Sequence, residues 1–277
     1  MKSGKKSTKK ATKSTKPKYN AKAKNKPSTA VPVAVKAYVK KAIHAQIENK
    51  QATPNGGQFF ISQYTPKVGT TPSITPSLLS LHDIFTGIGQ GTGQGDRIGN
   101  KIKPLNTILK GWVSISTLTT DPPSLSFYQY NLKMVIGKLN KQLTQPLNTD
   151  FDEYFQFGNS QHPPQSDMFD LLRNPNKDKF QIMETRLFKV GFQNGSGATV
   201  PINWNNDYKS GIPFYINLNK HLSTIKYNDT EAEPTNTAIY MWFFMCNADG
   251  SSIGPPDFPA KQQILLTYEM QTTYEDA

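Results

Sequence analysis

The chain has little cysteine and no long hydrophobic run. Cys246 is its only cysteine, which excludes an intrachain disulfide framework and a metal cluster built from cysteines. Because it lies in the apolar run IYMWFFMC, we predict a buried small side chain and not a reactive thiol. No segment approaches the roughly 18 apolar residues of a transmembrane helix, and the apolar core of a secretory signal is missing. We therefore expect neither membrane insertion nor secretion.

Motifs of catalytic and metal sites are also missing. The glycine-rich segment GIGQGTGQGDRIGNK fits neither GxGxxG nor the P-loop pattern, no GxSxG occurs, and the four histidines are far apart, with none in HExxH. Asp150, Asp152 and Glu153 form an acidic cluster, but neighbouring carboxylates in a loop are usually surface charges. We predict that the protein is not an enzyme and that it uses no cofactor and no metal.

The first 41 residues contain no acidic side chain but 14 lysines. The remaining residues carry 18 Lys plus Arg against all 20 Asp plus Glu, so their formal charge is −2 and that of the first 41 residues is +14. The formal net charge of +12 therefore resides entirely in the N-terminal segment. Such an asymmetry predicts that this segment binds a polyanion.

Residues 1–30 form an arm with 11 lysines, no arginine and, after Met1, no aliphatic side chain larger than alanine. This composition cannot bury enough apolar surface to offset the entropy of ordering, so we predict that the arm is disordered when free. Lysine meets phosphate as a point charge and does not read bases. We expect nucleic-acid binding that is independent of sequence and sensitive to salt.

The lysines up to residue 41 are thus the candidate nucleic-acid contacts. They are Lys2, Lys5, Lys6, Lys9, Lys10, Lys13, Lys16, Lys18, Lys22, Lys24, Lys26, Lys36, Lys40 and Lys41. Clusters such as Lys5, Lys6, Lys9 and Lys10 also match nuclear import signals, and an import role is compatible with nucleic-acid binding. The remaining alternative is a tail that only adds solubility.

A single amphipathic helix is predicted after the arm. Pro32 opens a stretch in which Val35, Tyr38 and Val39 begin an apolar pattern at three-to-four spacing, while lysines occupy other positions. We expect one helix face to dock on the body and the other to extend the basic surface. The chain then divides into a disordered arm (1–30), a helix and linker (31–50) and a body domain (51–277).

The body reads as all-β. Twenty prolines, 19 glycines and 27 Phe plus Tyr divide the chain into short segments. Alternating or continuous apolar patterns predict strands at 58–62, 102–118, 126–137, 178–192, 213–219, 239–246 and 263–274. The segment 178–192 is read as one long strand or a pair. Seven or eight strands with long loops favour a single eight-stranded antiparallel jelly-roll sandwich.

Particular residues refine this expectation. The segment 239–246 is apolar on both faces, which predicts a central strand covered on both sides, within one subunit or by a neighbour. Gly111 is read as a bend or bulge, and TPNGG at 53–57 as a turn. Trp112 and Trp242 are expected in the core, while Trp204, in a long loop, is the better candidate for a subunit interface.

The order of segments resembles that of capsid proteins from small eukaryotic viruses with circular single-stranded DNA, the circovirus-like group. The resemblance is carried by the Lys-rich arm, the VKKAI…IENK helix, the segment LLSLHDIFTGIGQGTGQGDRIGNKIKPLNTILKGWVSI and the terminal LTYEMQTTYEDA. Its most specific part is a QG…R.G.KI pattern that leads into the first jelly-roll strand of those proteins. The matching residues here are Gln94, Gly95, Arg97, Gly99, Lys101 and Ile102.

This resemblance implies an icosahedral shell of about 60 copies with the arms inside on the genome. It implies the viral genome, further copies of the chain, a host receptor and a nuclear import receptor as partners, with the protein found in the virion and, during assembly, in the host nucleus. The chain departs from the best-known members because its arm is rich in lysine instead of arginine. We read Arg97 as a structural hydrogen-bond donor, with genome contact as the alternative.

Three other readings remain. Jelly rolls of small RNA-virus coats contain similar GxG…R.G segments, so an RNA genome stays open. A cellular β-sandwich module with a basic tail would bind nucleic acid without forming shells. An enzyme with an unseen cofactor would need clustered ligands such as HxH, which the sequence lacks.

Overall fold

The computed structural model describes much of the sandwich and the helix that precedes it. The described residues are 32–46, 49–61, 65–66, 74–75, 77–93, 95–117, 128–140, 144–155, 162–192, 207–229, 231–252 and 262–276. The chain forms two compact units, Met1–Gln46 and Ile47–Ala277. The boundary falls between Lys41, which ends the lysine-rich segment, and Glu48, the first acidic residue. The arm at residues 1–30 lies outside the described residues.

The first unit contains helix α1 (Val33–Gln46), so the predicted helix is confirmed. It starts directly after Pro32, whose carbonyl accepts the first helical hydrogen bond from Lys36 N at 3.0 Å. Residues 47–48, which follow it, lie outside the described residues. Docking of its apolar face on the body stays a prediction.

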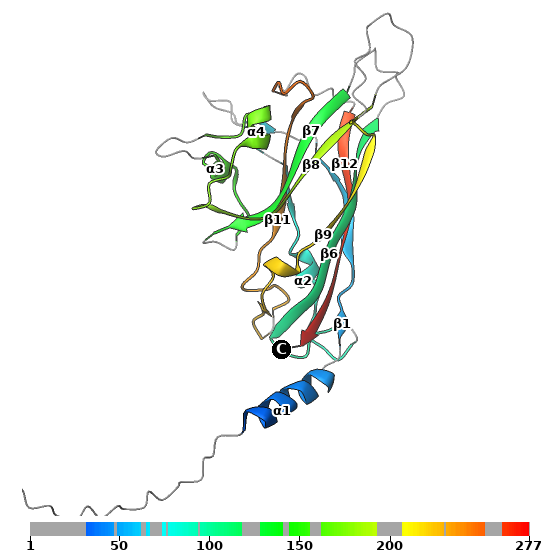
Figure 1. Cartoon of the computed structure of the whole chain (residues 1–277), viewed down its shortest axis with the longest axis vertical. Coiled ribbons are helices and arrows are strands. Elements are labelled where there is room, and N and C mark those ends of the chain that lie inside the picture. The colour runs from blue at the N-terminus through cyan, green and yellow to red at the C-terminus, as the bar shows by residue number, and fades with distance from the viewer. Residues whose placement is uncertain are drawn as a thin grey trace, which may run out of the picture. The chain divides into compact units, whose positions relative to one another are not determined.

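The second unit is built from two antiparallel sheets (Figure 1). One contains β1 (Lys50–Gln51), β2 (Asn55–Phe60), β6 (Lys101–Thr117), β9 (Gly211–Asn217), β10 (Ile225–Lys226) and β12 (Gln262–Asp276). The other contains β5 (Ser77–Ser80), β7 (Tyr128–Leu139), β8 (Phe180–Phe192) and β11 (Tyr240–Asn247). A small ladder joins β3 (Thr65–Pro66) to β4 (Ile74–Thr75). The described helices of this unit are the short α2 (Asp83–Thr86), α3 (Asn148–Phe151), α4 (Met168–Leu172) and 3-10 turn η1 (Asn219–His221).

The strand order is that of a jelly roll. In the first sheet β2 pairs with β12, β12 with β6, and β6 with β9; in the second, the order is β5, β11, β7, β8. Counting only these eight strands along the chain gives the orders 1-8-3-6 and 2-7-4-5, which is the double Greek key of a jelly-roll sandwich. The predicted fold class is therefore confirmed by the strand pairing itself.

Four local expectations were wrong or incomplete. The segment around Arg97 leads into β6, which is the third strand of the roll and not the first. NGG at 55–57 lies in β2, where a turn was expected, and β5 was not predicted as a strand. Gly111 causes no bulge, since its pairing with Tyr268 and Phe214 is regular. A side chain there would collide, because a Cβ would lie 2.5 Å from the Thr267 carbonyl oxygen.

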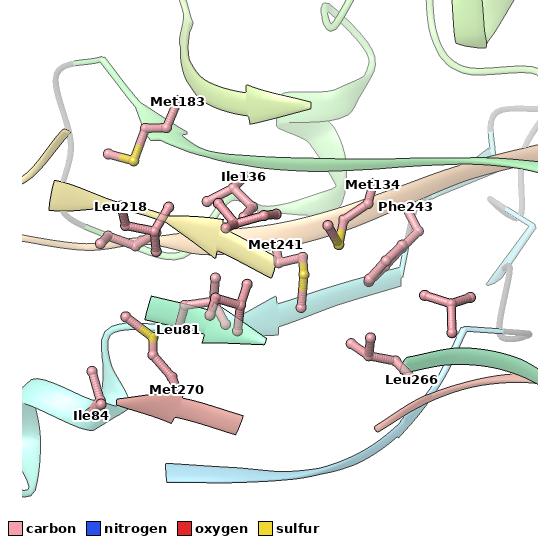
Figure 2. Close-up of a cluster of buried hydrophobic side chains, with 14 of the residues drawn as sticks. Leu81, Ile84, Met134, Ile136, Met183, Leu218, Met241, Phe243, Leu266 and Met270 are labelled. Carbon is pink, nitrogen blue, oxygen red and sulfur yellow. The ribbon is translucent and has the colours of Figure 1, made fainter. Parts of the chain in front are cut away.

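The core fills the space between the two sheets (Figure 2). Figure 2 shows methionine, leucine and phenylalanine side chains from both layers pointing into the same space. Met134 and Phe243 come from one sheet, and Leu266 and Met270 from the other. Alternating side chains on opposed sheets bury one face of each strand here, as period-two patterns predict.

The second sheet is covered on both faces. Along β11, Met241, Phe243 and Met245 belong to the core between the sheets, whereas Trp242 and Phe244 belong to a second buried cluster on the outer side. This outer cluster is completed by the segment of α3 and α4, which lies beside β7, β8 and β11 in Figure 1. The fully apolar strand is thus covered within one subunit. We call this layer the covered sheet.

The outer face of the first sheet lacks such a cover among the described residues. Phe60 is 39% exposed, Trp112 47% and Tyr215 59%. Trp112 was expected in the core, and this expectation was wrong; its indole packs across the backbone of Gly211, where a Cβ would lie 2.3 Å from the indole nitrogen. Trp242 is fully buried as expected, while Trp204 lies outside the described residues. We call β2, β12, β6 and β9 the open sheet.

Two buried charged side chains, Lys133 and Asp170, hold the α4 segment in place on the covered sheet, and no sequence pattern had suggested them. Lys133 from β7 donates to the carbonyl oxygens of Asp170 (3.2 Å) and Arg173 (3.4 Å). The buried Asp170 carboxylate accepts from the backbone amides of Gln165 (2.8 Å) and Ser166 (2.6 Å). Burial raises the pKa of Asp170 to about 6, although these hydrogen bonds oppose the shift.

Candidate nucleic-acid interface

Most of the candidate lysines, from Lys2 to Lys26, lie outside the described residues. Lys36, Lys40 and Lys41 belong to α1, and Lys36 is exposed to solvent. Exposure of a lysine leaves its ammonium available to phosphate, and it neither tests nor contradicts the assignment.

The glycine-rich segment before β6 is a folded loop of the sandwich. The two sides of the loop are hydrogen-bonded to each other, since Arg97 N donates to the Gly89 carbonyl at 2.9 Å and Gly91 N donates to the Arg97 carbonyl at 3.0 Å. The Asp96 carboxylate accepts from Gly93 N at 2.9 Å inside this loop. A Cβ on Gly91 would lie 2.4 Å from that carboxylate, so the glycines make room for an acid and not for a phosphate.

Arg97 occupies the centre of this region and is only 1% exposed. Its guanidinium donates to the carbonyl oxygens of Gly99 and Glu231, both at 2.8 Å, and to Asn100 Oδ1 at 3.2 Å. The guanidinium carbon lies 4.2 Å from the centre of the Tyr227 ring, a cation–π geometry. The group therefore fixes the loop to the segment after β10, and its described partners all belong to the fold.

The end of β12 and the start of β1 hold the same loop. Tyr274 donates its hydroxyl to the Gly95 carbonyl at 2.8 Å, and burial raises the pKa of Tyr274 to about 12. Lys50, which is buried, donates to the Asp96 carbonyl at 2.6 Å and pairs with Asp276 at 2.9 Å. Both chain segments that flank the sandwich domain are thereby anchored at one end of the open sheet.

The family-like residues divide between two roles. Gly95, Arg97 and Gly99 meet in the cluster just described. Gln94 lies outside the described residues. Lys101, the first residue of β6, is exposed. The segment thus combines a buried structural part with one outward-facing cation.

Lys226 is a residue that sequence reasoning missed. It forms half of the two-residue strand β10 and lies directly opposite Lys101 in the antiparallel ladder. Both side chains are exposed. A two-residue strand has no readable period, so only the register reveals that these lysines are neighbours.

Other residues weighed from the sequence lie in ordinary surroundings. Lys179 pairs with Asp150 and Glu153, each at 3.1 Å, and these contacts raise the pKa of Lys179 although burial opposes the shift. Cys246 is buried, as predicted. Among the described residues, no group of three or more His, Cys, Asp or Glu is arranged to hold a metal ion. None of the described helices has the length and apolar composition needed to cross a bilayer.

Comparison with known proteins gives weak likenesses. No protein-family model matches the chain, and no curated protein sequence matches it. It is similar to the solved structure of VP1 from trichodysplasia spinulosa-associated polyomavirus in complex with GM1 oligosaccharide, with 9% identity over 83% of this chain and 98% of that chain and a TM-score of 0.25. It is also similar to Merkel cell polyomavirus VP1 in complex with GD1a oligosaccharide, with 7% identity over 82% and 95% and a TM-score of 0.23.

A third similar structure is CorA, a surface-associated copper-binding protein of Methylomicrobium album BG8. The identity is 11% over 71% of this chain and 92% of that chain, and the TM-score is 0.19. At such scores none of the three likenesses carries an argument about function. The circovirus-like assignment therefore stays a prediction.

Proposed function

We propose that this chain is the structural capsid protein of a small eukaryotic virus with a circular single-stranded DNA genome. In this proposal the jelly roll self-assembles into an icosahedral shell of about 60 copies. The Lys-rich arm packages the genome on the inner side. The protein then resides in the virion, and the clusters Lys5, Lys6, Lys9 and Lys10 direct it to the host nucleus for assembly.

The observation that carries the proposal is the separation of charge between the two units. The unit Met1–Gln46 holds 14 lysines and no acid, and the unit Ile47–Ala277 holds a small excess of acids over bases. A nearly neutral sandwich can pack against its own copies, while repulsion is confined to arms that nucleic acid neutralises. About 60 copies of the first 41 residues, with 14 lysines each, carry about 840 positive charges, enough for a genome on the order of a thousand nucleotides.

The open sheet supports the self-assembly part of the proposal. It presents Trp112, Tyr215 and Phe60 to solvent, and its Lys110 and Glu269 pair at 3.1 Å. Around these aromatic side chains the face is thus apolar with one charge of each sign, which suits a second copy of the same face better than a polyanion. We assign a second copy of the chain as its occupant.

The test is expression of the full chain, followed by negative-stain microscopy and measurement of nuclease-sensitive absorbance on the same sample. Uniform shells that contain nucleic acid are expected, with release of that nucleic acid at high salt. Deleting residues 1–30 should leave the sandwich folded and lower the nucleic-acid content of each particle. A soluble monomer that binds nucleic acid would instead favour the cellular module, and unchanged content after the deletion would contradict the role of the arm.

The genome type needs its own measurement. Lysine contacts do not distinguish DNA from RNA, so a coat protein of a small RNA virus remains the second candidate. Selective digestion of the released nucleic acid by DNase or by RNase separates the two. Nucleic acid that is digested by RNase but not by DNase would contradict the DNA assignment and leave the capsid assignment intact.

A further inference from the structure

The exposed lysines of β6 have different neighbours in the ladder. Lys103 lies opposite Glu275, and Lys110 lies opposite Glu269. Each forms an ion pair with its partner, at 3.3 Å and 3.1 Å. Lys101 faces β10 instead, where its opposite residue is Lys226.

The two lysines of this pair point to the same side of the sheet. Ile102 and Ile225, which are also opposite each other, are both buried in the core. Because side chains alternate along a strand, Lys101 and Lys226 both point outward, and both are exposed. Opposed residues in an antiparallel ladder have Cβ atoms about 4.5–5.5 Å apart, and like charges at that spacing are destabilising.

In the described part of the chain, neither Lys101 nor Lys226 forms an ion pair. Some other exposed lysines of the sandwich do have acidic partners, such as Lys189 with Asp207 at 2.9 Å and Lys220 with Glu184 at 3.0 Å. Because Lys101 and Lys226 lie opposite each other, they leave a local excess of positive charge. An anion between the two ammonium groups would remove the repulsion.

The position of the pair fits the path of the chain. The first strand after the arm, β1, begins at Lys50 opposite Tyr274, which in turn lies opposite Pro104. From Pro104 to Lys101 is three residues, or about 10 Å along the strand. Nucleic acid captured by the arm is therefore delivered to this end of the sheet at a high effective concentration.

We propose that Lys101 and Lys226 form a phosphate-binding site on the sandwich that takes a backbone phosphate of the packaged strand. The proposal rests on the proposed function and deepens it, because it adds a fixed contact to the flexible contacts of the arm. Lysine contributes charge without reading bases, so the site accepts any sequence. Its role is to fix where the strand meets the shell wall.

The experiment measures how the affinity of the full-length chain for a labelled oligo(dT) depends on salt. Each phosphate contact adds about 0.7 to the slope of log affinity against log salt for single strands. Because the proposed site holds one phosphate, the double variant K101Q/K226Q is expected to lower this slope by about 0.7, and K177Q/K209Q is the matched control. Lys177 and Lys209 are exposed and have no ion pair among the described residues, and Lys209 lies just before β9, whose Gly211 pairs with Ser114 at the far end of β6.

The outcomes separate the two proposals. An equal slope for the double variant and the control overturns the site while leaving the packaging role of the arm intact. Failure of the unaltered chain to bind oligo(dT) overturns the proposed function itself. Loss of heparin binding in K101Q/K226Q with an unchanged oligo(dT) slope would assign the pair to sulfated polysaccharide and would also overturn the site.

A second measurement tests the geometry without nucleic acid. Replacing one lysine by K226Q removes the like-charge repulsion, so the melting temperature at low salt should rise, and this gain should shrink at high salt. K209Q should change little. A lower melting temperature for K226Q would contradict the repulsive contact on which the site depends.

Discussion

The two sheets of the sandwich share one core but differ in what covers their outer faces. The covered sheet carries α3, α4 and a second aromatic cluster, so its central strand β11 is buried on both sides. The open sheet presents Trp112 and Tyr215 to solvent. Tryptophan is therefore a buried core residue in the covered sheet, at Trp242, and a half-exposed surface residue in the open sheet, at Trp112. A buried aromatic cluster stabilises one outer face, and the other keeps the exposed aromatic surface to which we assign self-assembly.

The largest expected difference between the two sheets is the loss of folding stability when one tryptophan in each is replaced by alanine. Trp242→Ala removes a fully buried side chain that contacts Phe151, Tyr154 and Phe180, and we expect a loss of about 3–5 kcal/mol. Trp112→Ala should cost about 1 kcal/mol or less, since the side chain is half exposed. Urea unfolding of both variants gives the two values. Equal losses of unfolding free energy would show that the two outer faces contribute equally to stability.

Substitutions on the outer face of the open sheet should weaken assembly more than they lower folding stability. Trp112→Ala combined with Tyr215→Ala is expected to raise the concentration needed for shell formation by about 30-fold or more, equivalent to about 2 kcal/mol, if a second copy packs there. Light scattering against protein concentration measures this effect. Leu187→Ala, at an exposed position on the covered sheet, is the control and should assemble normally. Normal assembly of the double variant would remove the open face from the shell contacts.

Sequence patterns predicted the strands of the two sheets better than the segments that pack on their outer faces. Period-two alternation located β7 and β12 because half-buried strands leave that signature, and the continuous apolar run located β11 as a central strand. They did not decide whether the segment around α3 and α4 or a neighbouring subunit covers β11. Trp112 was misjudged because an aromatic residue in a strand looks the same on a covered face and on an open one.

The site was predictable only in part for a related reason. The lysine excess of the arm is a property of composition, which needs no fold to be visible. Arg97 was noticed as a motif residue, but its acceptors at Glu231 and Gly99 come from both near and far in the sequence. Lys226 became visible only through its register opposite Lys101. Pairings over more than a hundred residues are set by topology, which local patterns do not encode.

The covered sheet should also have a pH dependence that comes from its buried carboxylate, Asp170. Because the folded pKa of Asp170 is raised to about 6, above its ordinary value, the folded state binds this proton more tightly than the unfolded state. The contribution of Asp170 therefore becomes more favourable as the pH falls through 6 toward the ordinary carboxyl range. Between pH 7 and pH 5 the stability of the unaltered chain should gain about 1 kcal/mol relative to Asp170→Asn.

The measurement is urea unfolding of both proteins at the two pH values. Comparing the change in each removes the constant cost of the substitution and the titration of groups elsewhere. Burial lowers the pKa of Lys133, whose charge interacts with Asp170, so Lys133→Met is a useful companion variant. A difference that does not vary with pH would mean that the Asp170 carboxylate is not the source.

The smallest difference concerns the charges themselves. Lys110 and Glu269 on the open sheet are both substantially exposed and lie 3.1 Å apart, so water and salt weaken their attraction. A double-mutant cycle with Lys110→Ala and Glu269→Ala should give a coupling of about 0.2–1 kcal/mol that declines as salt is added. A larger, salt-insensitive coupling would mean that the pair is shielded from solvent, as it would be if a second copy already covered this face. The same cycle repeated below and above the assembly concentration therefore reports directly on whether the open sheet is open.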